Sequence, residues 1–233
     1  MNEKAPLFLA ATPRAAWTAG RPLVRALEVP DPVAICYVGA AFGDNRVVDW
    51  LVRRALHRCG RRARIDALRL ARGPVDLDAA RRMLAGTHVL FLGGGDTIEL
   101  VRRVREHDLV ESFREARATA RLVFGISAGA CAAAPYTIGY EDGGSGRIEA
   151  CLDMGCPAPL DVHDEENDWP EMRALLELAR ARPELAQEGI VLPRGAALLV
   201  RPDGTLASLG SALAERRRLG PGGEWITTPI ARP

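Results

Sequence analysis

Continuous apolar runs recur along the first half of the chain, with polar segments of helical character between them. A strand that is buried on one face alternates apolar and polar residues, whereas a strand covered on both faces is apolar throughout. The runs therefore predict strands of a parallel sheet that is sandwiched between helices. They are Leu7–Ala10, Val33–Val38, Thr87–Leu92 and the run that begins at Leu122, with a weaker candidate at Arg64–Leu70.

The segments between the runs have the apolar spacing of helices that cover a sheet. In the clearest of them, Asn45–Cys59, apolar residues recur three and four positions apart, and Gly60 stands where a helix C-cap belongs. The other predicted helices are Trp17–Leu27, Asp76–Leu84, Thr97–Arg105, Asp108–Ala120 and Pro170–Arg180. This alternation predicts an α/β fold, with a mostly parallel, doubly wound sheet that carries helices on both faces.

The end of the chain has the pattern of a β-hairpin. Ala196–Val200 and Thr205–Leu209 flank an Asp203-Gly204 turn, so we expect a C-terminal hairpin packed on the sheet. Arg216–Arg218 is interpreted as a solvated run, and Trp169 as a hydrophobic staple or a lid residue. A chain of 233 residues can bury one sizeable core and nothing in it resembles a linker, so residues 1–233 are expected to form a single domain.

Charge and composition exclude several classes of partner and site. The chain has 31 basic and 30 acidic residues, so it has no net positive charge large enough to attract nucleic acid or an anionic membrane. We expect neither partner. Lys4 is the only lysine, which argues against a P-loop and a Ser-Lys dyad. The five cysteines lack Cys-x-x-Cys spacing, and no run approaches the roughly 20 apolar residues of a membrane span. We expect a cytoplasmic protein without metal or cofactor.

The run at Leu122 ends in the string Gly125-Ile126-Ser127-Ala128-Gly129, which has the pattern Gly-x-Ser-x-Gly. A serine at a tight strand-to-helix turn needs small neighbours, and this string supplies them. Ser127 is the candidate nucleophile. The N–H of Ala128, at the start of the following helix, is a candidate donor to an oxyanion. The same string also fits an ordinary tight turn between a strand and a helix.

A second glycine-rich loop, Gly93-Gly94-Gly95-Asp96-Thr97, follows the strand at Thr87–Leu92. Loops after parallel strands meet at the carboxyl edge of a sheet, so this loop is expected near Ser127. The N–H of Gly95 is then the second candidate oxyanion donor, and Asp96 with Glu99 resembles a helix capping box. A plain capped turn and a phosphate cradle are the alternatives.

Among four histidines, only His163 follows the serine in the chain. It ends a short apolar stretch and precedes an acidic loop, a place from which a general base can be presented to a nucleophile. His163 is the candidate base, with a solvated loop histidine as the alternative. The acid that orients it is left open by the sequence, and the candidates are Glu141, Asp142, Asp161, Asp164 and Glu165.

Together, the glycine loop, the serine string and His163 resemble the serine peptidases of the dipeptidase E and cyanophycinase family. The resemblance covers nearly the whole chain and extends to Pro183-Glu184-Leu185 and Leu192-Pro193-Arg194-Gly195. It implies a fold like that of the class I glutamine amidotransferases, with serine in place of their cysteine. It also implies Ser127 as nucleophile, His163 as base, and the N–H groups of Gly95 and Ala128 as the oxyanion hole.

The chain departs from the family pattern at several positions. Asp96 stands where the family usually has asparagine, and Arg194 stands where dipeptidase E carries an acidic member of its triad. Asp142 falls at a position where that enzyme has an aspartate implicated in activity, so it is named as the third catalytic residue. The alternative is an incomplete triad.

The segment after His163 also differs, because it is acidic where dipeptidase E has a basic segment associated with its preference for N-terminal aspartate. Its acidic residues are Asp164, Glu165, Glu166 and Asp168. An anionic substrate side chain is repelled by such a segment, so Asp-X dipeptides are predicted to be poor substrates.

These expectations combine into a serine hydrolase that cleaves small peptides or related amides through an acyl-enzyme, as a monomer or homodimer. Two alternatives stay open at this point. One is a member of the family that lacks activity and binds a small ligand or a protein. The other is an esterase of the α/β-hydrolase type, although such enzymes place their histidine late in the chain.

Overall fold

The computed structural model describes residues 4–58, 61–140, 144 and 146–233. Its centre is a seven-stranded sheet with the strand order β11-β10-β1-β5-β4-β2-β3. Five neighbouring strands are parallel, namely β1 (Leu7–Ala10), β5 (Leu122–Ile126), β4 (Val89–Leu92), β2 (Val33–Val38) and β3 (Ala63–Leu68). The hairpin of β10 (Ala196–Val200) and β11 (Leu206–Gly210) extends the sheet antiparallel to β1. The predicted α/β fold and the predicted hairpin are both confirmed.

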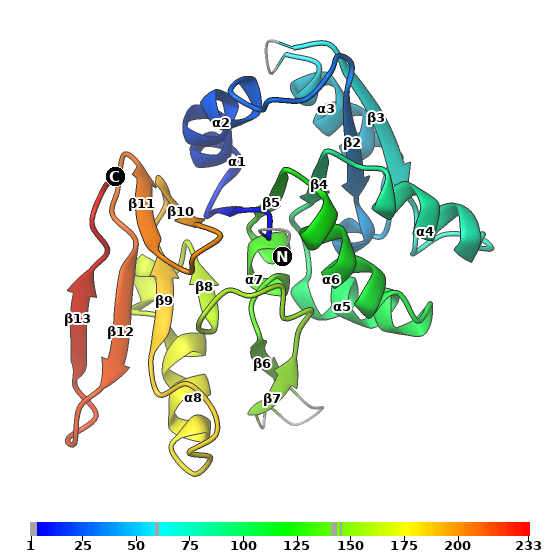
Figure 1. Ribbon diagram of the computed structural model, residues 1–233. Coiled ribbons are helices and arrows are strands. Elements are labelled where there is room, and N and C mark those ends of the chain that lie inside the picture. Colours follow the sequence, from blue (N-terminus) through cyan, green and yellow to red (C-terminus); the bar gives the residue numbers. More distant parts are fainter. Residues whose placement is uncertain (1–3, 59–60, 141–143, 145) are drawn as a thin grey trace.

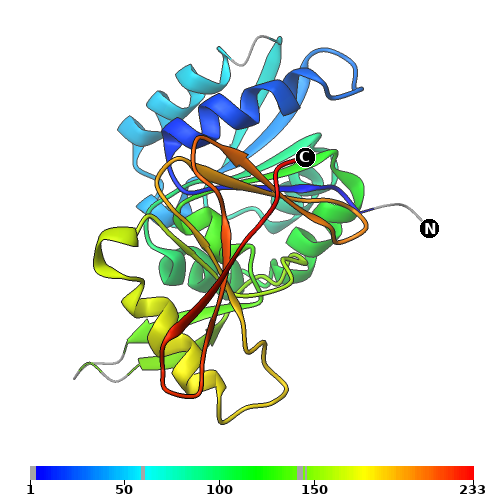
Figure 2. The same cartoon turned by 90° about the vertical axis from the view of Figure 1, so that its left-hand side faces the viewer.

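Helices cover both faces of this sheet. One face carries α1 (Pro13–Ala15), the π-helical segment Ala16–Gly20, α2 (Arg21–Arg25) and α3 (Arg46–Leu56). The other face carries α4 (Leu77–Ala85), α5 (Thr97–Glu106), α6 (Val110–Thr119) and α7 (Ala128–Ala132). Figure 2 shows the blue helices α1 and α2 on one side of the strands and the green helices on the other.

The side chains of each strand alternate between two apolar cores, one on each face. Leu7 and Leu9 of β1 belong to the core under α4–α7, whereas Phe8 and Ala10 belong to the core under α1–α3. A strand that is covered on both sides must be apolar at every position, because each residue faces one of the two cores. This explains the continuous apolar runs in the sequence.

A second sheet lies beside the central one, on the left in Figure 1. Its strand order is β13-β12-β9-β8, and only the pair of β8 (Leu160–Val162) and β9 (Gly189–Leu192) is parallel. The strands β12 (Glu215–Leu219) and β13 (Trp225–Pro229) complete it. The helix α8 (Pro170–Ala179) packs against this sheet and against the hairpin of β6 (Tyr136–Tyr140) and β7 (Gly146–Ala150).

Most of this second sheet has no clear signal in the sequence. The prediction that Arg216–Arg218 is a solvated run is wrong for Arg217, which lies in β12 with only 16% of its side chain exposed. Arg217 pairs with Asp168 and Glu215, and its guanidinium lies 5.6 Å from the ring centroid of Trp169. Trp169 is itself buried in a small apolar cluster, so it is a core residue and not a lid.

Candidate active site

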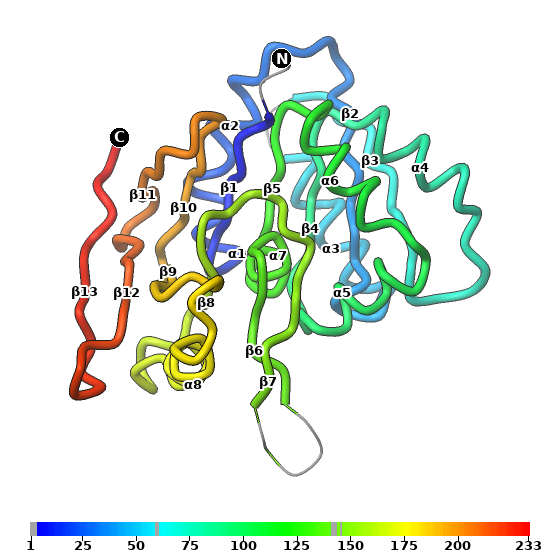
Figure 3. The backbone as a smooth tube through the Cα atoms, turned by 60° about the horizontal axis from the view of Figure 1, so that its bottom comes forward, coloured from blue at the N-terminus to red at the C-terminus, as the bar shows by residue number. Residues whose placement is uncertain are grey.

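Ser127 occupies a sharp turn between β5 and α7. Its φ is 52° and its ψ is −121°, a combination that is rare for a residue with a side chain. Its backbone N–H donates a hydrogen bond to the carbonyl oxygen of Ala10 at 2.9 Å, which ties the turn to the end of β1. This is the strained strand-to-helix turn that the Gly-x-Ser-x-Gly pattern indicates. It places Ser127 at the start of α7, and Figure 3 shows α7 in the middle of the molecule.

The glycines of the string let α7 lie against the neighbouring strand ends. A Cβ at Gly129 would be 2.3 Å from the carbonyl oxygen of Leu92, and a Cβ at Gly125 would be 2.8 Å from the carbonyl oxygen of Gly129. Both contacts are with backbone atoms, which cannot move aside as a side chain can. The sequence therefore needs glycine at both positions to hold Ser127 where it is.

The second glycine loop, 93–95, lies directly beside Ser127. A Cβ at Gly94 would be 3.4 Å from the Cβ of Ser127. Gly95 has a φ of +132° and leaves no space for a side chain, because its Cβ would be 2.2 Å from the carbonyl oxygen of Ala41. The Asp96 side chain accepts a hydrogen bond from the N–H of Glu99 at 2.9 Å, as predicted for a helix cap.

Two backbone N–H groups next to Ser127 can donate hydrogen bonds to an anionic oxygen. Gly95 and Ala128 line the same cavity as the Ser127 side chain. Within the described part of the chain, neither backbone N–H donates a hydrogen bond to another residue. An oxyanion hole requires unpaired N–H groups beside the nucleophile, so both groups are available for the predicted role.

His163 reaches Ser127 from the second sheet. The Nε2 atom of His163 lies 2.9 Å from the Oγ atom of Ser127, within hydrogen-bond distance. His163 follows the last residue of β8, and its own N–H donates to the carbonyl oxygen of Leu192 at 2.9 Å, which continues the pairing of β8 with β9. The structure thus brings together a serine and a histidine that lie on different sheets and are 36 positions apart in the sequence.

Comparison with known proteins identifies the family. The model of peptidase family S51 matches residues 29–205, which is more than half of the chain. The chain belongs to this family. It is therefore a serine peptidase of the dipeptidase E and cyanophycinase type, and this replaces the esterase alternative. Among curated proteins, no relative matches.

Two solved structures share the fold of this chain. A peptidase from an acI-B1 actinobacterium superposes with a TM-score of 0.72 at 15% sequence identity, over 99% of this chain and 96% of that chain. A protein from Listeria monocytogenes EGD-e that is described as a putative peptidase E superposes with a TM-score of 0.64 at 13% identity, over 90% of this chain and 100% of that chain. At these identities the likeness shows a shared fold.

None of the described residues takes the role of the acid that would orient His163. Asp142 and Glu141 lie outside the described residues. Within the ranges that the structure describes, no carboxylate forms a hydrogen bond with the ring of His163. Arg194, at the position where dipeptidase E has its acid, instead pairs with Glu166 at 2.8 Å. Asp142 thus stays a prediction from the sequence.

Glu165 lies two residues after His163 and contacts the segment of Arg194. Its Oε1 atom accepts a hydrogen bond from the backbone N–H of Arg194 at 3.0 Å. Its Oε2 atom is buried and has no hydrogen-bond partner among the described residues. Glu165 is therefore a second carboxylate to compare with Asp142. The sequence placed it among the candidate acids only because it is close to His163 in the chain.

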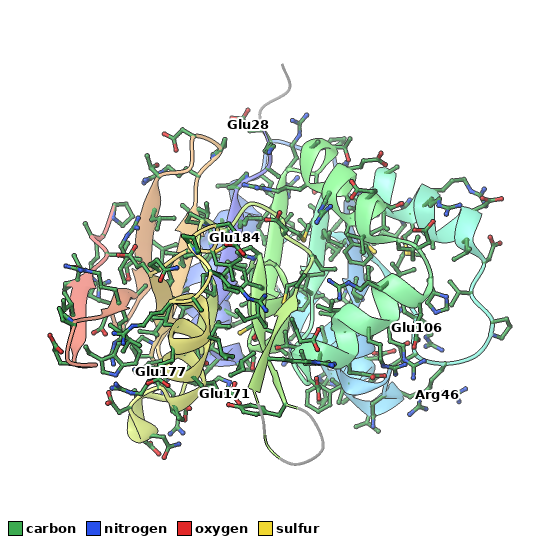
Figure 4. The ribbon with its side chains drawn as sticks, turned by 90° about the horizontal axis from the view of Figure 1, so that it is seen from below. Glu28, Arg46, Glu106, Glu171, Glu177 and Glu184 are labelled. Atoms are coloured by element: carbon green, nitrogen blue, oxygen red, sulfur yellow. The ribbon has the colours of Figure 1, made fainter. Side chains whose placement is uncertain are left out.

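A cavity of about 280 Å³ lies beside Ser127 and His163, and its walls are acidic. Asp161, Asp164 and Glu171 line it. Figure 4 labels Glu171, which comes from the start of α8. Of the described residues that line this cavity, only His163 can carry a positive charge.

Asp161 is the most perturbed of these carboxyl groups. Its Oδ1 atom accepts a hydrogen bond from the N–H of Val162 at 2.7 Å, while its Oδ2 atom is buried without a partner among the described residues. Burial raises the pKa of Asp161 from 3.8 to about 7, and the charges of Glu171 and Asp164 add to the shift. The sequence gives Asp161 no special standing among the acids near His163, because its burial depends on packing against α8.

Among the described residues around this cavity, no activated nucleophile or metal-binding cluster competes with Ser127. Cys131 lines the same cavity, but burial raises the pKa of its thiol well above 9.0, so it stays protonated. No cluster of metal-ligating side chains is found in the described residues. The described helices include none long and apolar enough to cross a bilayer.

Proposed function

We propose that Ser127 is the nucleophile and His163 the general base of this peptidase. The observation that carries the proposal is the 2.9 Å separation of Ser127 Oγ and His163 Nε2 at a strained strand-to-helix turn. His163 accepts the hydroxyl proton as the serine oxygen bonds to the carbonyl carbon of the substrate. The tetrahedral oxyanion accepts hydrogen bonds from the N–H groups of Gly95 and Ala128.

The reaction then proceeds through an acyl-enzyme. His163 gives its proton to the leaving amine, the carbon–nitrogen bond breaks, and the acyl group stays on Ser127 as an ester. A water molecule enters, His163 takes one of its protons, and the resulting hydroxide bonds to the ester carbon. Collapse of this second intermediate releases the acid, and the proton returns to the oxygen of Ser127.

The substrates that we propose are small peptides. The cavity beside His163, at about 280 Å³, is just below the roughly 300–1,000 Å³ that sites for small ligands occupy. Its walls carry Asp161, Asp164 and Glu171, which repel an anionic side chain. We therefore propose that Asp-X dipeptides are poor substrates, which separates this chain from dipeptidase E.

The third catalytic residue is proposed to be Asp142, on the strength of the sequence resemblance alone. A carboxylate on the Nδ1 side of a catalytic histidine fixes its tautomer and stabilises the imidazolium that forms. Glu165, with its buried and unpartnered Oε2 atom, is the comparison for this assignment.

We also propose that the enzyme works in the cytoplasm. The described cysteines Cys36, Cys131, Cys151 and Cys156 are all free and buried. Unpaired cysteines are typical of a reducing compartment. The chain is formally close to neutral at +1, and this supports a small-molecule substrate over nucleic acid or an anionic membrane.

Hydrolysis of a panel of dipeptides tests the proposal. The wild-type enzyme is expected to cleave neutral dipeptides such as Ala-Ala, and both Ser127→Ala and His163→Ala are expected to lose at least ~10³-fold in kcat/KM. Ser112→Ala, which removes a hydroxyl from α6 away from the site, is the matched control and should retain the wild-type rate. A Ser127→Ala variant that keeps its activity contradicts the proposal.

A further inference from the structure

The two central strands of the sheet, β5 and β4, are both followed by helices on the same face. The strands β5 and β4 lie between β1 and β2. The helices that follow β1 and β2 cover one face, whereas α7 and α5, which follow β5 and β4, pack together with the core of the other face. The helical segment Ala16–Gly20 packs over β1 and the Phe124 ring of β5, whereas α3 packs against β3. This region is a topological switch point, where open α/β sheets bind their ligands.

A groove of about 410 Å³ occupies this position. Its floor is made of the aromatic side chains of Tyr37, Phe91 and Phe124 from β2, β4 and β5. The rings of Phe91 and Phe124 are stacked with their centroids 5.0 Å apart, and those of Tyr37 and Phe91 are 5.6 Å apart. Contacts between rings at these distances hold each ring in place, so the floor is preorganised.

The two walls of the groove are also apolar. Trp17 and Val24 come from the helical segment after β1, and Val48 and Val52 come from α3. Arg21 is the one charged side chain among the described lining residues, and its guanidinium lies 5.6 Å from the ring centroid of Trp17. A ligand in this groove therefore needs an apolar body, and a basic side chain is excluded by Arg21.

The groove ends at the reacting groups. Ser127 lines it, and so do Gly93, Gly94 and Gly95 of the oxyanion loop. The acid-lined cavity reaches Ser127 from the side of His163. A substrate whose carbonyl carbon is at Ser127 Oγ can thus extend a neighbouring side chain into the apolar groove. This continuity with the nucleophile identifies the occupant as part of the substrate.

We propose that the groove between α2 and α3 binds a large apolar side chain, such as phenylalanine or leucine, on a residue that flanks the scissile bond. The inference rests on the proposed function of Ser127 and adds a substrate class to it. Burial of such a side chain in a preformed apolar site stabilises the bound state in proportion to the apolar area removed from water. The enzyme is therefore a dipeptidase for neutral, apolar substrates.

Two dipeptide series test this substrate class. In X-Ala and Ala-X, X is Gly, Ala, Leu, Phe, Asp or Lys, and kcat/KM is measured for each peptide. In one of the two series, Phe and Leu are expected to exceed Ala by roughly 30-fold, which corresponds to burial of a large side chain. The series that shows the effect identifies the side of the scissile bond. Equal rates for Ala, Leu and Phe in both series overturn the inference but leave the proposed function intact.

A pair of tryptophan variants on α3 tests the groove itself. Val52→Trp fills the groove and is expected to lower the ratio of kcat/KM for the Phe peptide over the Ala peptide at least ~10-fold. Val47→Trp makes the same change on the same helix at a position that is 67% exposed and does not line the groove, so the ratio should stay at its wild-type value. An unchanged ratio in a folded Val52→Trp variant contradicts the assignment. A change in oligomeric state with no change in the ratio also contradicts it, because the groove would then be an interface between copies of the chain.

Calorimetric binding to the Ser127→Ala variant gives a readout that does not depend on turnover. The Phe peptide is expected to bind at least ~10-fold more tightly than the Ala peptide, with a negative heat-capacity change from burial of apolar surface. Tighter binding of Phe without hydrolysis by the wild type would support the groove and contradict the proposed function. Equal binding of both peptides would contradict the groove.

Discussion

The Cα atom of Gly129 faces the carbonyl oxygen of Leu92 so closely that a Cβ at this position would lie 2.3 Å from that oxygen. This contact places the first turn of α7 against the end of β4. It therefore sets the distance between Ser127, at the start of α7, and the glycine loop that follows β4. A backbone contact thus determines how the proposed nucleophile and the proposed oxyanion donors are arranged.

Gly129→Ala is expected to destabilise the protein by about 2 kcal/mol or more, because a methyl group against a backbone oxygen forces α7 to shift. The value of kcat/KM should also fall, and by more than unfolding of part of the protein would explain, since the shift separates Ser127 from the N–H of Gly95. Thermal unfolding and kcat/KM are measured together. Gly86→Ala is the control, because its φ is negative and the nearest atom to its Cβ would be at 3.3 Å. Wild-type values for both measurements in Gly129→Ala would contradict this account of the turn.

Asp161→Asn is expected to stabilise the protein above neutral pH. Burial raises the pKa of Asp161 from 3.8 to about 7, so between these two pH values the folded state keeps a proton that the unfolded state has lost. The free energy of unfolding of the wild type therefore decreases as the pH rises through this window, and the full cost is present above pH 7. The asparagine variant lacks this cost, which is on the order of 2 kcal/mol after allowance for screening by solvent.

Thermal unfolding at pH 5 and at pH 8 checks this expectation. The variant should unfold several degrees above the wild type at pH 8, and the difference should be smaller at pH 5. A wild-type protein that gains stability relative to Asp161→Asn as the pH rises would mean that the carboxylate is stabilised by a partner in the folded state.

Glu171→Gln is expected to improve Asp-X substrates relative to neutral ones. Glu171 is one of the acidic side chains that line the cavity beside His163, and its removal weakens the repulsion of an anionic substrate. The ratio of kcat/KM for Asp-Ala over Ala-Ala should rise about 3- to 10-fold, and the gain should shrink at high salt. Glu177→Gln removes the same charge farther along α8, outside the cavity lining, and should leave the ratio unchanged (Figure 4). An equal effect of both variants would show that the net charge, and not the cavity, controls the preference.

Asp142→Asn is expected to lower kcat roughly 10²-fold or more if this carboxylate orients His163, since the histidine then loses its preferred tautomer. Glu165→Gln is the comparison, because its Oε2 atom is buried and unpartnered close to His163 in the chain. Single-turnover rates over the pH range distinguish the two. A large loss in Glu165→Gln together with a normal Asp142→Asn enzyme would assign the acid to Glu165, and normal rates in both would leave a Ser-His dyad.

The central fold could be predicted from the sequence because its signal is local. Each strand of the parallel sheet is apolar at every position, as in Val33–Val38, and each βα turn at the site is marked by glycine. Ser127 and His163 were also identifiable, because Gly125–Gly129 has the Gly-x-Ser-x-Gly pattern and one histidine alone follows it. That they are 2.9 Å apart depends on the second sheet, most of whose strands were not predicted.

The parts that could not be predicted depend on contacts between distant segments. The strand β8 has only three residues, and β12 contains Arg216–Arg218, so neither has a long apolar run of the kind that marks the central strands. The apolar groove follows from the strand order, which brings Phe91 and Phe124 between the helical segment after β1 and α3, and strand order is not encoded in any local period. The burial of Asp161 likewise depends on where α8 packs.

The most direct test of the account is the site of covalent modification by a fluorophosphonate probe, read by mass spectrometry of the intact protein and its peptides. We predict one adduct, on Ser127, that is absent in Ser127→Ala and forms at least ~10²-fold more slowly in His163→Ala. An adduct on another residue, or peptide hydrolysis by a Ser127→Ala enzyme that carries no adduct, would contradict it.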